Sequence, residues 1–179
     1  ARVPQTLRFL AAGGVDLAPD EQEGLPAIKY DPTLALVIVL DGSPALPPPG
    51  AVQRDVGPFS FVADNEAKGL AEQPALTLHA SAALSTTLWN ESDAKAIATL
   101  LDQADEFLGD RKVLDAHLTR WEFATPQSVW TNRTATVADE PGPLLLAGDA
   151  FGGPRVEGAW LSGDAAAAAV LKRLGHEDS

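Results

Sequence analysis

The chain of 179 residues contains neither cysteine nor methionine. Without cysteine, disulfide bonds, thiolate metal sites and cysteine nucleophiles are all excluded. Without methionine the sequence has no initiator, and its first residues, ARVPQTLRFL, read as the interior of a chain. We therefore expect a piece of a longer protein, either cloned or cut.

Long apolar runs and clusters of basic residues are also absent. No stretch approaches the roughly 20 apolar residues that span a bilayer, and no signal peptide is visible. The formal net charge is −12, and an acidic surface repels nucleic-acid phosphates and anionic membrane faces. We expect a soluble, cytoplasmic protein whose partner is neither a nucleic acid nor a membrane.

The motifs of several enzyme classes are missing as well. The 3 histidines, His79, His117 and His176, are not closely paired, so the sequence predicts no metal site. No G-x-S-x-G segment supports a serine nucleophile, and no G-x-G-x-x-G segment is present to cradle the pyrophosphate of a dinucleotide. The sequence alone therefore identifies no catalytic residue.

Apolar and charged residues make up 45% and 21% of the chain, which is typical of a globular protein with a real core. Apolar periodicity predicts helices over 4–12, 93–108 and from about 156 onward, and strands over 27–40, 59–65, 75–82, 112–126 and 144–147. Residues 15–26 and 41–51 are expected loops, and 129–137 either a loop or a short strand. Pro32 predicts a kink or a sheet edge. This order indicates an α+β fold: a mixed, largely antiparallel sheet with flanking helices and a C-terminal βα unit.

The C-terminal part reads LLLAGDAFGGPRVEGAWLSGDAAAAAVL over residues 144–171. Leu144–Ala147 is expected to be a buried strand, and Gly148-Asp149 follows at its carboxyl end. The helix that follows has unpaired N–H groups at its start, which can hold an anion or an electron-rich carbonyl. Its expected apolar spine is Val156, Trp160, Gly163, Ala167, Val170 and Leu174. Gly158, Ala159, Ser162 and Gly163 are small, so we expect that another backbone can approach this helix closely. An ordinary βα unit, in which Asp149 caps a turn, explains the same pattern.

The segment LAGDAFGGPRVEGAWLSGDAAAAAVL resembles the carboxyl-terminal flavin motif of the FAD-dependent amine oxidase superfamily, above all that of its bacterial renalase-like members. The segments RVPQTLRFL, YDPTLALVIVL, FSFVADNEAKG, LTLHAS and RWEFATP are similar to renalase-like segments and follow in the same order. The resemblance covers nearly the whole chain. Its last motif is specific, and the others are informative through their order.

The resemblance implies a site for FAD in the C-terminal segment. It places the Asp149 carboxylate against the ribityl chain and the helix start against the pyrimidine end of the isoalloxazine ring. The implied cofactor-binding residues are Gly148, Asp149, Arg155, Val156, Glu157, Gly158 and Ala159. N–H dipoles at a helix start would stabilise the negative charge of a reduced flavin.

His79, Trp121 and Trp160 are the candidate substrate-binding residues. The resemblance suggests a place near the flavin for His79, while its position on the polar face of a strand equally suits a surface or hydrogen-bonded histidine. Trp121 and Trp160 suit the walls of a flat aromatic pocket, and core packing explains each of them as well.

The resemblance also implies a division into regions. Residues 1–140 would form a substrate-binding domain, 141–175 a strand–loop–helix that completes the FAD-binding domain, and 176–179 a tail. Because the glycine-rich pyrophosphate loop is missing, we expect the parent protein to bind FAD. We expect this chain to hold FAD weakly or not at all, and to be inactive alone. The implied reaction is hydride transfer from a reduced nicotinamide-type or amine substrate to FAD, with reoxidation by O2 to H2O2.

A non-catalytic binding domain without a cofactor is the alternative. A missing dinucleotide domain would leave an apolar face uncovered, and such a face favours self-association. The cofactor content of the parent protein and the oligomeric state of this chain distinguish the two hypotheses.

Overall fold

The computed structural model describes residues 2–17, 19–138 and 142–175 of the chain. It consists of two compact units: unit 1 comprises residues 1–31 and 125–179, and unit 2 comprises residues 32–124. The elements in chain order are α1 (Val3–Ala12), α2 (Pro19–Gly24), the 3-10 helix η1 (Leu25–Ala27), β1 (Tyr30–Leu40), β2 (Ala51–Gln53), β3 (Phe59–Asp64), β4 (Ala75–Ala80), α3 (Ala82–Leu88), α4 (Asp93–Asp102), α5 (Asp105–Leu108), β5 (Val113–Pro126), β6 (Ala135–Ala138), β7 (Leu144–Leu146) and α6 (Val156–Arg173). The predicted α+β class is confirmed.

A five-stranded sheet in the order β2-β3-β4-β1-β5 forms the frame of unit 2. β1 pairs antiparallel with β4 from Ala35 to Val39, and β3 pairs antiparallel with both β2 and β4. β1 is thus an inner strand over Ala35–Val39, and Pro32 precedes this stretch, on a part of β1 that does not pair with β4. Pro32 is tolerated there because it lies ahead of the stretch that pairs with β4.

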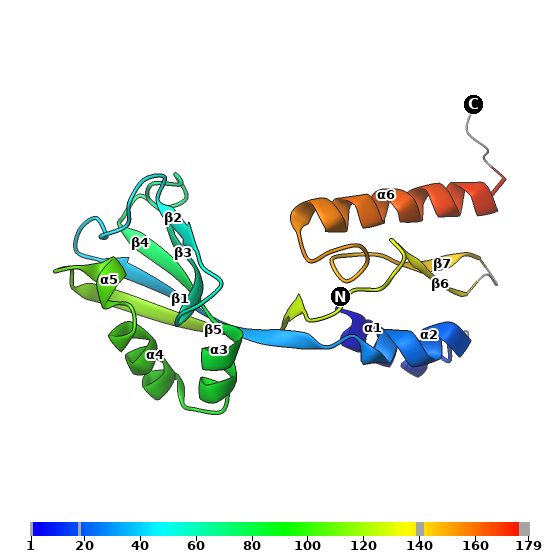
Figure 1. Ribbon diagram of the computed structural model, residues 1–179, viewed down its shortest axis with the longest axis horizontal. Helices are drawn as coiled ribbons and strands as arrows, with labels where there is room; N and C mark the ends of the chain where they lie inside the picture. Colours follow the sequence, from blue (N-terminus) through cyan, green and yellow to red (C-terminus); the bar gives the residue numbers. More distant parts are fainter. Residues whose placement is uncertain (1, 18, 139–141, 176–179) are drawn as a thin grey trace. The chain divides into compact units, whose positions relative to one another are not determined.

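The helices α3, α4 and α5 supply the side chains that cover one face of this sheet, with α3 and α4 visible beside it in Figure 1. The predicted alternation of β4 is confirmed, because Leu76, Leu78 and Ala80 are buried in the core. The core of unit 2 consists of Leu34, Leu36, Ile38, Leu40, Phe59, Val62, Leu76, Leu78, Ala80, Leu88, Ala96, Leu100, Ala104, Phe107, Leu108 and Leu118.

The helix predicted over 93–108 has its expected start but is interrupted. The Ser92 hydroxyl accepts a hydrogen bond from Lys95 N at 3.3 Å, as an N-cap does. Residues 103–104 break the predicted helix into α4 and α5, and Gly109 ends it. The strand expected to reach residue 82 ends at Ala80, because the Ser81 hydroxyl caps a helix, α3, that the sequence did not predict. The short strand β2 was also missed, since it begins at the end of the expected loop 41–51.

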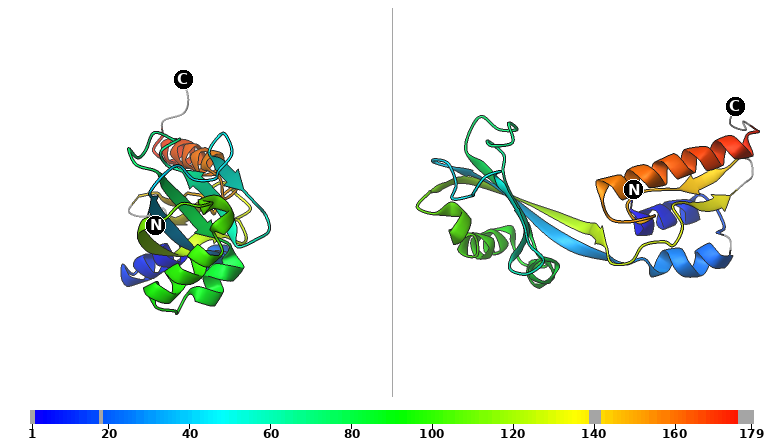
Figure 2. Two further views of the ribbon diagram at one scale, coloured as in Figure 1. Left: turned by 90° about the vertical axis from the view of Figure 1, so that its left-hand side faces the viewer. Right: turned by 45° about the horizontal axis from the view of Figure 1, so that its top comes forward.

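In unit 1, the antiparallel pair β6–β7 lies between α6 on one side and α1 with α2 on the other (Figure 2). The 15–26 loop prediction is wrong, because α2 and η1 fold within it. The core of unit 1 consists of Val3, Leu10, Leu25, Ile28, Ala135, Val137, Leu146, Ala150 and Phe151. The helix predicted over residues 4–12 is confirmed as α1. For residues 129–137 the sequence allowed a loop or a short strand, and the structure shows the short strand β6 at the end of this segment.

The packing face of α6 is the main correction to the sequence analysis. α6 begins at Val156 as predicted, but its buried residues are Gly158 and Ser162 rather than the expected apolar spine. Val156, Trp160 and Leu174 are 89%, 66% and 59% exposed. The strand expected to be buried is likewise only partly so, because Leu146 is buried while Leu144 is 36% exposed.

The functional division at residue 140 stays a prediction, since compactness divides the chain at different places. Residues 139–141 and the tail over 176–179, which includes His176, lie outside the described residues. No helix in the described part of the chain combines the length and apolar character that a membrane crossing requires.

Candidate functional site

The loop between β7 and α6 turns on three glycines in unit 1. Gly148, Gly152 and Gly153 have φ angles of 145°, 101° and 129°, which side chains rarely adopt. The turn is closed by Phe151 N, which donates to Gly148 O at 3.0 Å, and by Arg155 N, which donates to Gly153 O at 2.9 Å. The glycines therefore bring this loop back over the start of α6.

Ser162 ties the loop to α6. Its hydroxyl, fully buried, accepts a hydrogen bond from Gly148 N at 2.9 Å and donates one to Arg133 O at 2.5 Å. One helical side chain thus fixes both the β7–α6 loop and the segment before β6. The two segments are held at a defined place relative to the first turns of the helix.

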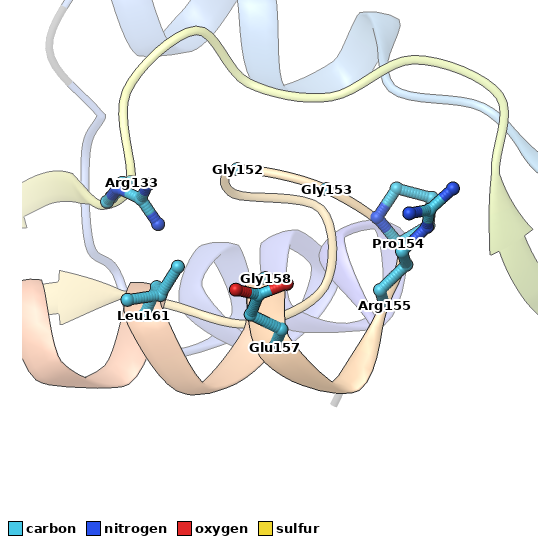
Figure 3. A pocket seen from close by; sticks show the side chains of 8 residues that line it. All are labelled: Arg133, Gly152, Gly153, Pro154, Arg155, Glu157, Gly158 and Leu161. Carbon is cyan, nitrogen blue, oxygen red and sulfur yellow. The ribbon is translucent and has the colours of Figure 1, made fainter.

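A cavity of about 500 Å³ opens between these segments. Figure 3 shows Arg133 on one side of it, Pro154 and Arg155 on the other, and the glycine loop facing the start of α6. The lining residues are Arg133, Gly152, Gly153, Pro154, Arg155, Glu157, Gly158 and Leu161. Two guanidinium groups against one carboxylate give the lining a net positive formal charge within a strongly acidic chain.

The start of α6 adds hydrogen-bond donors to this cavity. The first N–H groups of a helix have no carbonyl partner within the helix and carry partial positive charge. Gly158 lacks a side chain where one would not fit, since a Cβ there would lie 2.4 Å from Gly153 O. The backbone of Gly153 fills the space beside Gly158, and the helix start suits an electron-rich group such as a carbonyl.

Asp149 is held from the other end of the chain. Its Oδ2 atom accepts a charge-assisted hydrogen bond from the Arg2 guanidinium, 147 residues away in sequence. The Tyr30 hydroxyl lies in the same neighbourhood and accepts a hydrogen bond from Val3 N at 3.4 Å. Burial raises the pKa of Tyr30, and the negative charge of Asp149 raises it further, whereas the bond from Val3 and the charge of Arg2 lower it.

The structure separates the predicted cofactor-binding residues into two groups. Arg155, Glu157 and Gly158 line the cavity. Gly148 and Asp149 lie at the beginning of the same loop, and the side chain of Val156 is exposed. Ala159, whose N–H donates to Arg155 O at 2.9 Å, closes the first turn of α6.

His79 and Trp121 lie on the same face of the unit 2 sheet. This is the face opposite the helices, because Leu78 and Leu118 point into the core beside them. The His79 ring is half-buried, with its centroid 5.5 Å from that of Phe61. Burial lowers the pKa of His79, and the positive charge of Lys68 lowers it further. Trp121 is 56% exposed.

Trp160 belongs to unit 1 and lies on the exposed side of α6. The structure therefore brings two of the three predicted substrate-binding residues to one surface, within unit 2. Neither Trp121 nor Trp160 is a core residue, so the core-packing interpretation is wrong for both.

Sequence reasoning missed Arg133, Arg2 and Tyr30. Arg133 and Arg2 were single basic residues outside any motif, and only the folded chain shows their neighbours. Ser162 carried a weak signal as a small residue in an apolar helix. Within the described residues, no group of three histidine, aspartate or glutamate side chains could hold a metal ion.

Comparison with known proteins gives likenesses of fold. No protein-family model matches the sequence, and no curated protein does. A crystal structure of a proposed protoporphyrinogen oxidase from Exiguobacterium sp. 255-15 is similar over 93% of this chain, with a TM-score of 0.58 and 15% sequence identity. The likeness concerns the fold alone, and this chain spans 38% of the length of that protein.

Two further structures are more loosely similar. The PF1083 protein from Pyrococcus furiosus matches 90% of this chain and 36% of its own, with a TM-score of 0.49 and 17% identity. A reduced UDP-galactopyranose mutase matches 60% of this chain and 25% of its own, with a TM-score of 0.42 and 18% identity. At these TM-scores the likenesses do not define a shared fold.

Proposed function

We propose that this chain is part of an FAD-dependent oxidoreductase of the renalase-like kind, and that its β7–α6 loop binds part of the flavin. The observation that carries the proposal is the cavity at the start of α6, which is lined by glycine backbone and by the guanidinium groups of Arg133 and Arg155. The resemblance of residues 146–171 to a flavin motif supports the same assignment.

The residues present fit one part of FAD. Small-molecule sites have volumes of roughly 300–1,000 Å³, and a cavity of about 500 Å³ falls in this range. Glycine backbone allows a flat ring to come close, and the helix start suits an electron-rich carbonyl. The sequence holds no G-x-G-x-x-G loop for a pyrophosphate, so we expect this chain to bind the ring and its hydroxyl chain weakly.

In this proposal the chain's residues bind and orient, while bound FAD supplies the capacity to accept a hydride. Asp149 accepts a hydrogen bond from a hydroxyl group, and the α6 start with Arg133 stabilises negative charge on the ring. His79 and Trp121 stay candidate substrate-binding residues on the open face of the unit 2 sheet. The proposed substrate is a reduced nicotinamide-type compound or an amine, which loses a hydride; O2 then takes up two electrons and two protons to give H2O2.

The test is a titration of the purified chain with riboflavin, followed by flavin fluorescence. We expect weak, saturable binding that Leu161→Trp lowers at least about tenfold, because the indole fills the cavity that Leu161 lines. Ala168→Trp, at an exposed position of the same helix that does not line the cavity, is the matched control and should leave binding unchanged. Absence of saturable binding, or equal binding by both variants, would contradict the proposal.

The exposed side of α6 favours a second role, self-association. Val156, Trp160, Leu171 and Leu174 are each at least 46% exposed and recur at helical spacing, and we name them the α6 outer stripe. Large apolar side chains exposed on one side of a surface helix mark a surface for protein contact. We propose that this chain, without a catalytic role of its own, associates with a second copy through this stripe.

A further inference from the structure

The ion pair between Arg2 and Asp149 joins two segments that are 147 residues apart in the sequence. Arg2 precedes α1, and its carbonyl accepts a hydrogen bond from Thr6 N at 2.9 Å. Arg2 N donates to Gln5 Oε1 at 3.3 Å, so the backbone of Arg2 is fixed at the helix start. Its side chain leaves α1 and meets Asp149 in the β7–α6 loop.

The pair is partly screened from solvent. The side chains of Arg2 and Asp149 are 39% and 24% exposed, so the contact is neither a surface pair nor a buried one. The Tyr30 hydroxyl is near enough for its pKa to respond to both charges. Arg2, Asp149 and Tyr30 therefore form one polar cluster at the beginning of the proposed flavin loop.

The Oδ1 atom of Asp149 is available to accept a further hydrogen bond. Arg2 occupies Oδ2, and no described residue donates a hydrogen bond to Oδ1. An ionised carboxylate has about four acceptor positions on its two oxygens, so a bond to one oxygen does not prevent a bond to the other. A guanidinium restricts the rotation of the carboxylate that it binds, because the hydrogen bond is directional.

We propose that Arg2 is a positioning residue, which orients the Asp149 carboxylate so that Oδ1 accepts a hydrogen bond from a hydroxyl of the flavin's polyol chain. This inference rests on the proposed flavin site and adds to it the residue that prepares Asp149. Arg2 does not touch the ring in this arrangement. Loss of Arg2 therefore weakens binding of flavins that carry the polyol chain and leaves binding of the bare ring unchanged.

The experiment compares two probes that differ in that chain. Riboflavin carries the polyol chain, and lumiflavin has a methyl group in its place. Dissociation constants for both are measured by flavin fluorescence with the wild-type chain, Arg2→Gln, Asp149→Asn and the double variant. Arg8→Gln, an exposed arginine in α1, is the control for loss of one positive charge.

We expect Arg2→Gln and Asp149→Asn each to raise the riboflavin dissociation constant about tenfold, the effect of losing one hydrogen bond to a charged group. The double variant should bind riboflavin no more weakly than Asp149→Asn, because Arg2 acts through Asp149. Lumiflavin binding should stay within about twofold throughout, and Arg8→Gln should match wild type.

The remaining outcomes separate the two proposals. If lumiflavin binds saturably but Arg2→Gln leaves riboflavin affinity unchanged, or weakens both probes alike, the positioning role is wrong and the flavin site stands. If neither probe binds to the wild-type chain, both proposals are wrong. Circular dichroism and melting temperature identify a variant that has lost its fold, and Arg2→Lys, which keeps the charge, then replaces Arg2→Gln.

Discussion

Gly158 determines how closely the start of α6 approaches its loop. A Cβ at this position would lie 2.4 Å from Gly153 O and 3.0 Å from the carbonyl carbon, and neither backbone atom can rotate away. Gly158→Ala should therefore destabilise the chain by about 1–2 kcal/mol, as overpacking does even after the gain in helix propensity. Urea denaturation followed by circular dichroism measures this change.

Gly163→Ala is the matched control for this prediction. Gly163 lies in the same helix, is exposed, and has no atom within 4 Å of where its Cβ would be. Its substitution should stabilise the helix by about 0.5–1 kcal/mol, because alanine is the better helix former. Equal effects of the two substitutions would show that the loop does not press on α6 as described.

The lowered pKa of His79 predicts that the stability of unit 2 depends on pH. Its pKa is lowered by burial and then by Lys68, relative to an unfolded value of about 6.5. Protonation of His79 therefore favours the unfolded state, so its contribution is fully present above about pH 6.5 and is lost as the pH falls through the folded pKa. The urea midpoint of unit 2 should fall between pH 7 and pH 5.

Substitution identifies the group responsible. His79→Gln should flatten this part of the pH profile, and His117→Gln, on exposed β5 surface, should leave the wild-type slope in place because His79 is retained. Hydrogen exchange of peptides from unit 2, measured at each pH, reports the change. An unaltered slope in His79→Gln would assign the pH dependence to other groups.

At the scale of elements, α6 shows where sequence reasoning works and where it fails. The start at Val156 was predictable from the glycines and proline before it. The small residues Gly158 and Ser162 were expected to allow close approach of another backbone, but the apolar spine predicted the wrong buried face. Apolar periodicity selects the largest side chains, whereas the loop backbone packs so closely on α6 that only Gly158 and Ser162 fit beneath it. The same reasoning succeeded for β4, where ordinary side-chain packing against helices decides the face.

Sequence reasoning also predicted some parts of the candidate site and missed others. The sequence predicted the loop and the position of Asp149, since glycine and aspartate patterns mark such turns. It gave no signal for Arg133 or Arg2, because a lone arginine has no periodicity and its partner is distant in sequence. The helix α2 escaped prediction because it is 6 residues long and lacks an apolar repeat.

The α6 outer stripe leads to a prediction about this element. Trp160→Glu places a charge in the stripe and should weaken self-association at least about tenfold in sedimentation velocity. Because Trp160 is 66% exposed, the stability of unit 1 should change by no more than about 0.5 kcal/mol. Ala168→Glu, an exposed position of α6 outside the stripe, is the control. A chain that is monomeric at all concentrations would contradict the self-association proposal.

At the scale of the whole molecule, the residues that the structure describes form two cores that share no residue. One core lies entirely within unit 1 and the other entirely within unit 2. Each buries its own aliphatic side chains, among them Leu25 in unit 1 and Leu36 in unit 2, both with 0% exposure. A unit with its own core can unfold by itself, so one free energy of unfolding need not describe the chain.

Leu25→Ala and Leu36→Ala test this independence in the full chain. Truncating a fully buried leucine costs about 2–5 kcal/mol through lost transfer energy and the cavity left behind. Hydrogen exchange by mass spectrometry should show faster exchange only in peptides of unit 1 for Leu25→Ala, and only in peptides of unit 2 for Leu36→Ala. If either substitution accelerates exchange equally in both units, they unfold as one cooperative body. If each substitution instead accelerates exchange only in its own unit, the units unfold independently. In that case riboflavin, which we expect to bind unit 1, should slow exchange in unit 1 peptides alone.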